Sequence, residues 1–360
     1  MLINWLAQLP AASVAQLAGL SRRMYCFAYH DALWRGFVAQ DFGGSWSTFR
    51  STWRNTYKAL ALERRQPPRL SPEAPVPPPD AETAPPPSAL VMDVPIRCDG
   101  VFSDVLYLSW RNAHLDLHVD AAHDEATSAR QGPLLSDAAF TQQYMEGPDG
   151  IGAPVILTNV VTTWPIYRTW PAAEQRWQAA TFQAESVRTT YAAYQSYAAQ
   201  THDESPLYLF DKDMHHATDV ATFPVPAVFS EDWFHVLGPA GRPDFRWLIV
   251  GPARAGSTFH IDPNATSAWN AVITGRKRWI LFPPGVTPPG VYPSEDGGEV
   301  TTPECIVDWW ISYLPIARAQ AMPFVEGTCA AGEMIFVPSG WWHAVINLDA
   351  SVAITQNFVA

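Results

Sequence analysis

The stretch Ser257-Thr258-Phe259-His260-Ile261-Asp262-Pro263 decides how this chain is interpreted. Side chains two residues apart on a β-strand point to the same face, so His260 and Asp262 can reach one ion together. A later histidine, His343, follows the turn-like run Pro338-Ser339-Gly340. Two histidines and one carboxylate are the ligand set of non-haem Fe(II) sites, which keep open positions for a cosubstrate and dioxygen. The sequence therefore predicts an iron centre at His260, Asp262 and His343.

Apolar, strand-like segments surround this motif. Trp247-Leu248-Ile249-Val250 precedes it, Arg278-Trp279-Ile280-Leu281-Phe282 follows it, and Met334-Ile335-Phe336-Val337 precedes the later histidine. Two further His-x-Asp pairs lie within the run from His114 to Asp120, where they alternate with Leu and Val. That alternation predicts a half-buried strand with a solvated polar face, without a metal site.

The segments Gly251 to Pro284 and Gly332 to Phe358 resemble the Jumonji-C oxygenases. The strongest resemblance is to the branch that includes the bifunctional arginine demethylase and lysyl hydroxylase once called the phosphatidylserine receptor. It runs from about residue 135 to the C-terminus and includes Pro154-Val155-Ile156-Leu157-Thr158 and the run from Ser205 to Asp211. The resemblance implies a mainly β fold, a double-stranded β-helix (jelly-roll or cupin-like barrel) with flanking helices.

The resemblance also implies the cofactors Fe(II), 2-oxoglutarate and O2. It identifies His260, Asp262 and His343 as the iron ligands and Lys277 as the cation for the distal carboxylate of 2-oxoglutarate. A buried lysine is costly without an anion, which agrees with this role. The implied hydrogen-bonding partners of the cosubstrate are Asn270, Thr355 and the hydroxyl of Ser257.

Three polar positions have an alternative or a supporting role. Asn270 and Thr355 can also be interpreted as ordinary polar residues that cap a strand ladder. Asn347, four residues after His343, is expected to orient a ligand or the cosubstrate from the surrounding shell.

The chain departs from its relatives at several points. They carry a 2-oxoglutarate-binding tyrosine before a helical stretch, whereas the matching segment Phe182 to Val187 has none and leaves that contact in doubt. Ser257 stands where relatives usually have threonine, which keeps the hydroxyl. The sequence ends at Ala360 where relatives continue into dimerising helices, so a dimer cannot be inferred from the resemblance and the oligomeric state stays open.

Composition limits the classes of protein and partner. The chain has 360 residues, with 23 basic and 35 acidic side chains and a net charge of −12. This balance disfavours sequence-independent binding of nucleic acid and suits a basic protein or peptide substrate. The absence of a long apolar run and of a signal peptide predicts a soluble protein of the nucleus or cytoplasm, without a membrane partner. The scattered cysteines are expected to be reduced, mostly buried thiols: Cys26, Cys98, Cys305 and Cys329.

A proline-rich segment separates two predicted domains. Residues 63–92 contain little aliphatic surface and predict an extended linker, with a proline-motif ligand as the alternative. The oxygenase domain is predicted over 93–360, with its barrel core at about 231–360. Within it, we expect a helix from Val187 to Gln200 whose tyrosines pack in the core, and a surface role for the Asp and His residues of 213–219.

Residues 1–62 predict a separate helical module. Leu6, Leu9, Val14, Leu17 and Leu20 recur at helical spacing, with Pro10 as a break and Ser13 as an N-cap. A second helix is expected from Ser21 through Trp34. The pattern resembles an F-box, which implies docking on a Skp-type adaptor through Leu9, Pro10, Leu17 and Trp34. The alternative is a helical cap that packs on the barrel.

The sequence therefore predicts an Fe(II)- and 2-oxoglutarate-dependent dioxygenase that hydroxylates a protein lysine or arginine, in the latter case with demethylation. One alternative is a non-catalytic F-box receptor of a cullin ubiquitin ligase, and another is an RNA-nucleoside hydroxylase. A metal-binding cupin such as an isomerase is disfavoured, because such barrels commonly use more histidines and need no buried lysine.

Overall fold

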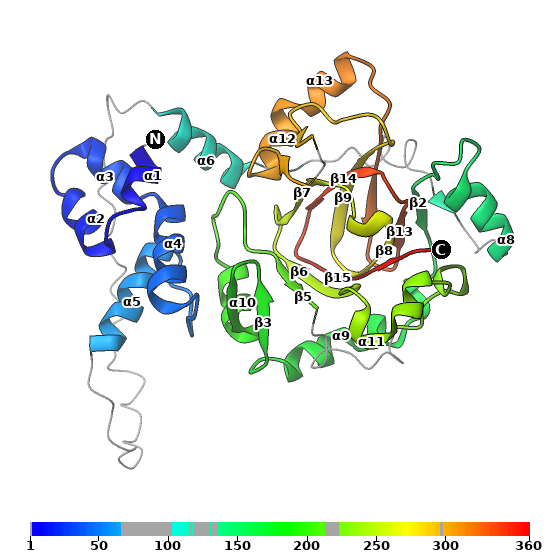
Figure 1. Ribbon diagram of the computed structural model, residues 1–360. Coiled ribbons are helices and arrows are strands. Elements are labelled where there is room, and N and C mark those ends of the chain that lie inside the picture. The colour runs from blue at the N-terminus through cyan, green and yellow to red at the C-terminus, as the bar shows by residue number, and fades with distance from the viewer. Residues whose placement is uncertain are drawn as a thin grey trace, which may run out of the picture. The chain divides into compact units, whose positions relative to one another are not determined.

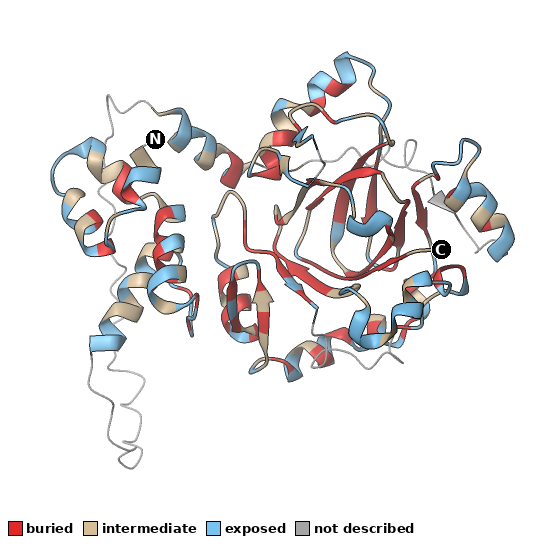
Figure 2. Ribbon diagram, in the orientation of Figure 1, coloured by how far each residue is buried: buried red, intermediate tan, exposed pale blue. Residues whose placement is uncertain are grey.

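A computed structural model of the chain describes residues 2–65, 103–115, 117, 130–131, 136–212, 223–295 and 298–360. The chain divides into two compact units, Met1–Leu106 and Tyr107–Ala360 (Figure 1). Each has its own buried side chains (Figure 2).

Helices build the first unit around an aromatic core. They are α1 (Leu2–Leu6), α2 (Ala11–Leu17), α3 (Arg22–Ala28), α4 (Asp31–Phe42) and α5 (Trp53–Arg65). The buried Trp34 donates its indole N–H to the Ala28 carbonyl at 2.7 Å and packs against Phe37 and Tyr57. The Asp31 carboxylate accepts the backbone N–H of Trp53 at 3.0 Å, which satisfies a donor at the start of α5.

Two expectations for this unit were wrong in detail. Ser21 caps α3, but that helix ends at Ala28 and α4 begins at Asp31, so the predicted second helix is two helices. Ser13 lies inside α2, whose N-cap position is Pro10. Helix α5 continues through Arg65 into the predicted linker. The rest of that linker, residues 66–92, lies outside the described residues, so the predicted domain limits stay predictions.

Two sheets form the barrel of the second unit (Figure 1). In the described residues, the larger has the order β1-β2-β13-β8-β15-β6-β5-β3-β4 and the smaller the order β12-β9-β14-β7. The larger sheet consists of β1 (Arg130–Gln131), β2 (Val155–Leu157), β3 (Thr181–Ala184), β4 (Val187–Thr190), β5 (Leu209–Asp211), β6 (Arg246–Gly251), β8 (Ser267–Thr274), β13 (Met334–Val337) and β15 (Ser351–Phe358). The smaller consists of β7 (Gly256–His260), β9 (Arg276–Phe282), β12 (Val325–Ala330) and β14 (Trp342–Asn347).

The inner faces of the two sheets pack on each other. One apolar cluster combines Ala268, Ile335 and Val337 of the larger sheet with Leu281 and Val345 of the smaller sheet. Neighbouring strands within these sheets are antiparallel apart from β1 and β2. This arrangement is the mainly β barrel that the sequence predicts.

Helices cover the outer faces of the barrel. On the smaller sheet lie α12 (Ile306–Ser312) and α13 (Leu314–Ala319), and Trp309 of α12 contacts Phe259 at a ring-centroid distance of 4.6 Å. On the larger sheet, α9 (Pro165–Arg176) contacts β8, and α10 (Tyr191–Ala198) contacts β4. The remaining elements are α6 (Asp104–His114), α8 (Asp137–Phe140), α11 (Gly238–Gly241), the hairpin of β10 (Tyr292–Pro293) and β11 (Val300–Thr301), and the short helical turns Thr141–Glu146, Val161–Thr163, Ala227–Phe229, Trp233–Leu237 and Pro263–Ala265.

Some expectations for this unit are corrected as well. His114 ends helix α6 and does not begin a strand, while most of the run after it lies outside the described residues. The helix expected from Val187 begins at Tyr191, because 187–190 form β4; its three tyrosines are fully buried as packing residues. The predicted surface group at 213–219 lies outside the described residues. No described helix is long and apolar enough to cross a bilayer.

Candidate iron and cosubstrate site

Three predicted residues converge inside the barrel. His260 ends β7, Asp262 follows two residues later, and His343 lies on the adjacent β14, directly opposite His260. The Nε2 atom of each histidine is 3.8 Å from a carboxylate oxygen of Asp262. One donor atom from each of the three residues lies within 4.8 Å of the others. This spacing allows one ion to contact all three side chains.

Hydrogen bonds fix which nitrogen of each histidine faces the others. Nδ1 of His260 is 2.8 Å from the Thr258 carbonyl, and Nδ1 of His343 is 3.0 Å from the Trp341 carbonyl. A carbonyl can only accept, so each Nδ1 carries a proton and, when the ring is neutral, each Nε2 keeps a lone pair. Burial, followed by the effect of His343, lowers the pKa of His260 to about 4, so this ring is neutral at physiological pH.

The Asp262 carboxylate between these rings has one oxygen without a hydrogen-bond donor among the described residues. Oδ2 of Asp262 is buried, and no described residue donates a hydrogen bond to it. A buried carboxylate that faces two nitrogen lone pairs is unfavourable until a cation binds among them. Neutral imidazoles and a carboxylate suit Fe(II), so the side chains present fit this metal.

The turn that follows Asp262 is strained and firmly held. Asn264 and Ala265 adopt positive φ values of 59° and 52°, which are uncommon for residues other than glycine. The Thr266 hydroxyl donates to the Pro263 carbonyl at 2.8 Å and accepts the Asn357 amide at 3.0 Å. These contacts join the last barrel strand to the turn, which keeps the Asp262 backbone in place.

A cavity extends from the triad into the barrel. Strand register gives its depth: on β9, Leu281 lies opposite His343, whereas Lys277 lies opposite Asn347. Four strand residues correspond to about 13 Å, which a lysine side chain and a small dicarboxylate can span together. Side chains from both sheets line this cavity: Tyr208, Phe210, Ile249, Ser257, His260, Asp262, Ala268, Asn270, Lys277, Trp279, Val337, His343, Val345, Thr355 and Asn357.

Lys277 forms the deep end of this cavity. Its side chain is 1% exposed, and its ammonium donates to the Tyr208 hydroxyl at 2.7 Å. No carboxylate within the described part of the chain forms an ion pair with it. Burial lowers the pKa of Lys277 to about 7. An anion beside the ammonium would stabilise its charged form, so the site fits the distal carboxylate of 2-oxoglutarate.

Tyr208 is the site residue that the sequence interpretation missed. Relatives carry a tyrosine in the segment that matches 182–187, where Phe182 of this chain is part of the core. In the structure, Tyr208, which directly precedes β5, contacts Lys277. A usable signal was present, because Tyr208 and Phe210 alternate with Leu209 in a strand-like run. Gly251 makes room for the ring: a Cβ there would lie 2.7 Å from Cδ2 of Tyr208.

The other predicted cosubstrate residues differ in which hydrogen-bonding groups they leave free at the cavity. Asn270 lines the cavity, and its buried Oδ1 lacks a hydrogen-bond partner among the described residues. Thr355 also lines the cavity, but its hydroxyl donates to the Trp269 carbonyl at 2.8 Å and therefore has only acceptor capacity left. Asn347 does not line the cavity; it is fully buried, and its amide donates to the Gly251 and Pro252 carbonyls. That bracing contact fits a supporting residue.

Ser257 reaches the cavity through an irregularity in β7. Val345 is paired with Ser257 and His343 with His260, so β7 has one more residue than β14 over the same interval. Plain alternation would turn a residue three positions from His260 to the other face. The extra residue changes this parity and lets Ser257 and His260 line the same cavity.

Comparison with known proteins agrees with this geometry. The family model of the cupin-like domain matches residues 179–360. The arginine-specific demethylase JMJ22 of Arabidopsis thaliana is 36% identical across the whole chain, which covers 67% of that relative. The chain belongs to the cupin-like Jumonji-C oxygenase family.

Two other members of this family are informative. The bifunctional arginine demethylase and lysyl-hydroxylase psr-1 of Caenorhabditis briggsae is 35% identical over 57% of the chain and 55% of its own length. The 2-oxoglutarate and iron-dependent oxygenase JMJD4 of Homo sapiens is 37% identical over 42% of the chain and 36% of its own length. Family membership and the donor set agree on iron and 2-oxoglutarate as cofactors.

Removing either His260 or Asp262 should abolish stoichiometric Fe(II) binding. We expect His260→Ala and Asp262→Ala to lose the metal but keep the fold, because a three-ligand site has no spare donor while apolar strands hold the barrel. Anaerobic Fe(II) titration and thermal melting measure these two effects. His235→Ala, at an exposed histidine, is the matched control. Wild-type iron binding by Asp262→Ala would contradict the assignment.

Binding of 2-oxoglutarate should weaken as the pH rises above about 7, the pKa of Lys277 in the free site. The bound carboxylate raises that pKa, so binding takes up a proton and the apparent Kd should increase up to about tenfold per pH unit above neutrality. Isothermal titration between pH 6 and pH 9 with a redox-inert metal in place of iron would measure this slope.

Lys277→Met provides the control for that titration. Breaking one side of a buried charge pair costs about 3–5 kcal/mol, so affinity should fall by at least about a hundredfold. The remaining affinity should no longer depend on pH in this range. A pH slope that persists in Lys277→Met would show that another group binds the carboxylate.

Proposed function

We propose that this oxygenase hydroxylates lysine or arginine side chains of a protein substrate. Where the hydroxylated carbon is an N-methyl group of arginine, the C–N bond of the resulting hydroxymethyl group breaks, formaldehyde leaves and the nitrogen keeps a proton. The observation that carries the proposal is a cavity with unpaired charged groups at both ends. At one end, Oδ2 of Asp262 has no hydrogen-bond donor among the described residues, and at the other, the Lys277 ammonium has no carboxylate partner among them. One oxygen atom of O2 enters the substrate C–H bond. The other enters succinate, which forms from 2-oxoglutarate with release of CO2.

The proposed roles of the side chains follow from their positions. His260, Asp262 and His343 hold iron, and Lys277 with Tyr208 holds the distal carboxylate of 2-oxoglutarate. When bound, iron and 2-oxoglutarate supply the oxidising chemistry that activates O2. The barrel contributes fixed donor atoms, an apolar wall and exclusion of water.

The net charge of the chain and its similarity to named relatives support a basic protein substrate. The names of the relatives from Arabidopsis thaliana and Caenorhabditis briggsae refer to arginine or lysine. This chain carries a net charge of −12, and it has no lysine or arginine between Arg278 and Arg318, a segment that includes Glu295, Glu299 and Glu304. The net negative charge of this segment favours encounter with cationic peptides.

Mass spectrometry should detect a hydroxylated product on basic peptides. Lysine- and arginine-containing peptides incubated with protein, Fe(II), 2-oxoglutarate and O2 should gain the mass of one oxygen atom, or lose a methyl group when the arginine is N-methylated. Product formation should match succinate formation and weaken with salt, because the attraction is screened. Asp262→Ala is the inactive control.

RNA remains the alternative substrate in this test. A nucleoside C–H bond suits the same iron centre, although the acidic charge disfavours phosphate contacts. Succinate formation that RNA stimulates and basic peptides do not would overturn the protein-substrate proposal. The complete triad and the buried lysine favour an enzyme over a non-catalytic receptor.

We further propose that residues 1–62 dock on a Skp-type adaptor. Support comes from apolar side chains that this unit leaves exposed, with Trp5 at 56% and Leu20 at 71%, beside the half-buried Leu9 and Leu17. Trp34 is removed from the predicted docking residues, because it is 4% exposed and part of the unit's own core.

A pull-down with purified adaptor tests this docking proposal. Pro10→Glu and Leu20→Glu should abolish capture, because they place a charge on the exposed apolar surface. Leu62→Glu makes the same kind of change at an exposed position of α5 and should leave capture unchanged. Failure of the wild-type protein to bind would favour the helical-cap interpretation.

A further inference from the structure

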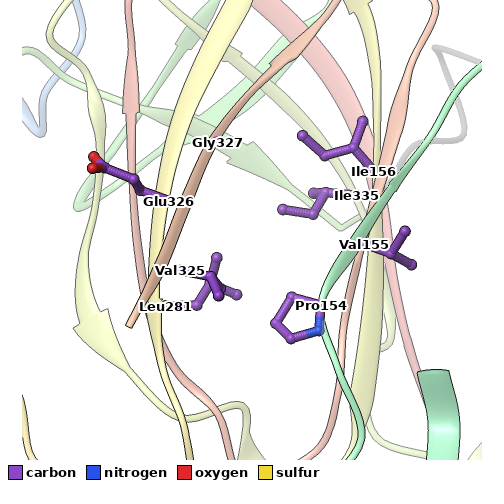
Figure 3. A pocket seen from close by; sticks show the side chains of 8 residues that line it. All are labelled: Pro154, Val155, Ile156, Leu281, Val325, Glu326, Gly327 and Ile335. Carbon is purple, nitrogen blue, oxygen red and sulfur yellow. The ribbon is translucent and has the colours of Figure 1, made fainter. Parts of the chain in front are cut away.

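A second, smaller cavity opens between the two sheets (Figure 3). It is a narrow opening that lies between β2 of the larger sheet and β12 of the smaller sheet. We call it the apolar slot. Its lining residues are Pro154, Val155, Ile156, Leu281, Val325, Glu326, Gly327 and Ile335.

The charged residue of the slot does not make it polar. The carboxylate of Glu326 binds Arg278 and Arg318, each at 2.7 Å. Figure 3 shows that this carboxylate points away from the aliphatic side chains of Leu281 and Ile335. The remaining lining is proline, glycine and aliphatic residues, which offer little to hold water, a dianion or a peptide.

Apolar side chains lie between the slot and the iron end of the larger cavity. Leu281 lines the slot and is the direct cross-strand partner of His343, so their Cβ atoms are about 5 Å apart. On β13, Ile335 lines the slot, while Val337, two residues further on and on the same face, lines the larger cavity. These residues belong to one apolar cluster that also includes Ala268 and Val345 of the larger cavity.

We propose that the apolar slot admits dioxygen to the iron centre. O2 is small and uncharged and favours apolar surroundings, whereas 2-oxoglutarate and a basic peptide need the polar cavity. Once these two occupy that cavity, O2 needs a separate route, and the slot ends one side chain from a proposed iron ligand. The inference rests on the proposed function, because only an O2-consuming reaction gives the slot this purpose.

Val325 is the position at which to close the slot. It is 38% exposed at the rim and lies directly opposite Leu281, so a larger side chain there can cover the opening without entering the core. Val325→Trp should raise the KM for O2 by about threefold to tenfold, while Fe(II) affinity, the KM for 2-oxoglutarate and kcat at saturating O2 stay unchanged. Val325→Thr, of nearly equal volume, is the control. An unchanged KM for O2 in Val325→Trp would overturn the proposal.

Xenon provides a test of the slot that does not depend on turnover. Xenon-pressurised crystals of the wild type should show the gas beside Leu281 and Ile335, and those of Val325→Trp should not. Absence of xenon from the slot of an active wild-type enzyme would overturn the route alone. A wild-type protein that never forms succinate from 2-oxoglutarate would overturn the proposed function and the route with it.

Discussion

A carboxylate and an ammonium group are buried in one barrel without neutralising each other. Asp262 faces two histidines, and Lys277 lies several residues deeper against a tyrosine hydroxyl. Burial of a charge without a partner costs several kcal/mol, so a barrel that only needed stability would bring the two together or lack both. Their separation means that each needs a partner from outside the chain, a cation at one end and an anion at the other.

The fold maintains this separation through strand register. Lys277 and the Leu281 that faces His343 lie on the same strand, so their distance along the barrel is fixed by the backbone of β9. Gly251 leaves room for the Tyr208 ring, and the Asn347 amide donates to the carbonyls of Gly251 and Pro252. Loss of register on any of these strands would turn the side chains to the other face.

Local sequence patterns predicted the parts of the site that depend on one strand at a time. The i, i+2 spacing of His260 and Asp262 and the strand-like surroundings of His343 predict that the three side chains meet, since Asp262 keeps an extended backbone beyond the end of β7. What local patterns could not predict depends on long-range contacts. The partner of Lys277 comes from a distant segment, the Thr355 hydroxyl is taken by a carbonyl on another strand, and Ser257 faces inward because of a bulge. Trp34 has the composition of a docking residue, and only the packing of Phe37 and Tyr57 shows that it is core.

The charges at the two ends of the cavity are balanced when both ends are empty and again when both ligands are bound. With Asp262 ionised and Lys277 protonated, Fe(II) alone would leave the site with an excess of two positive charges, and 2-oxoglutarate alone with an excess of two negative charges. Together they bring the sum to zero. In a cavity of low polarity, the Coulomb attraction between metal and cosubstrate is weakly screened, so each favours binding of the other by the same factor. The buried charges that make the empty barrel costly therefore make the loaded site selective, because a lone metal or a lone dianion leaves it unbalanced.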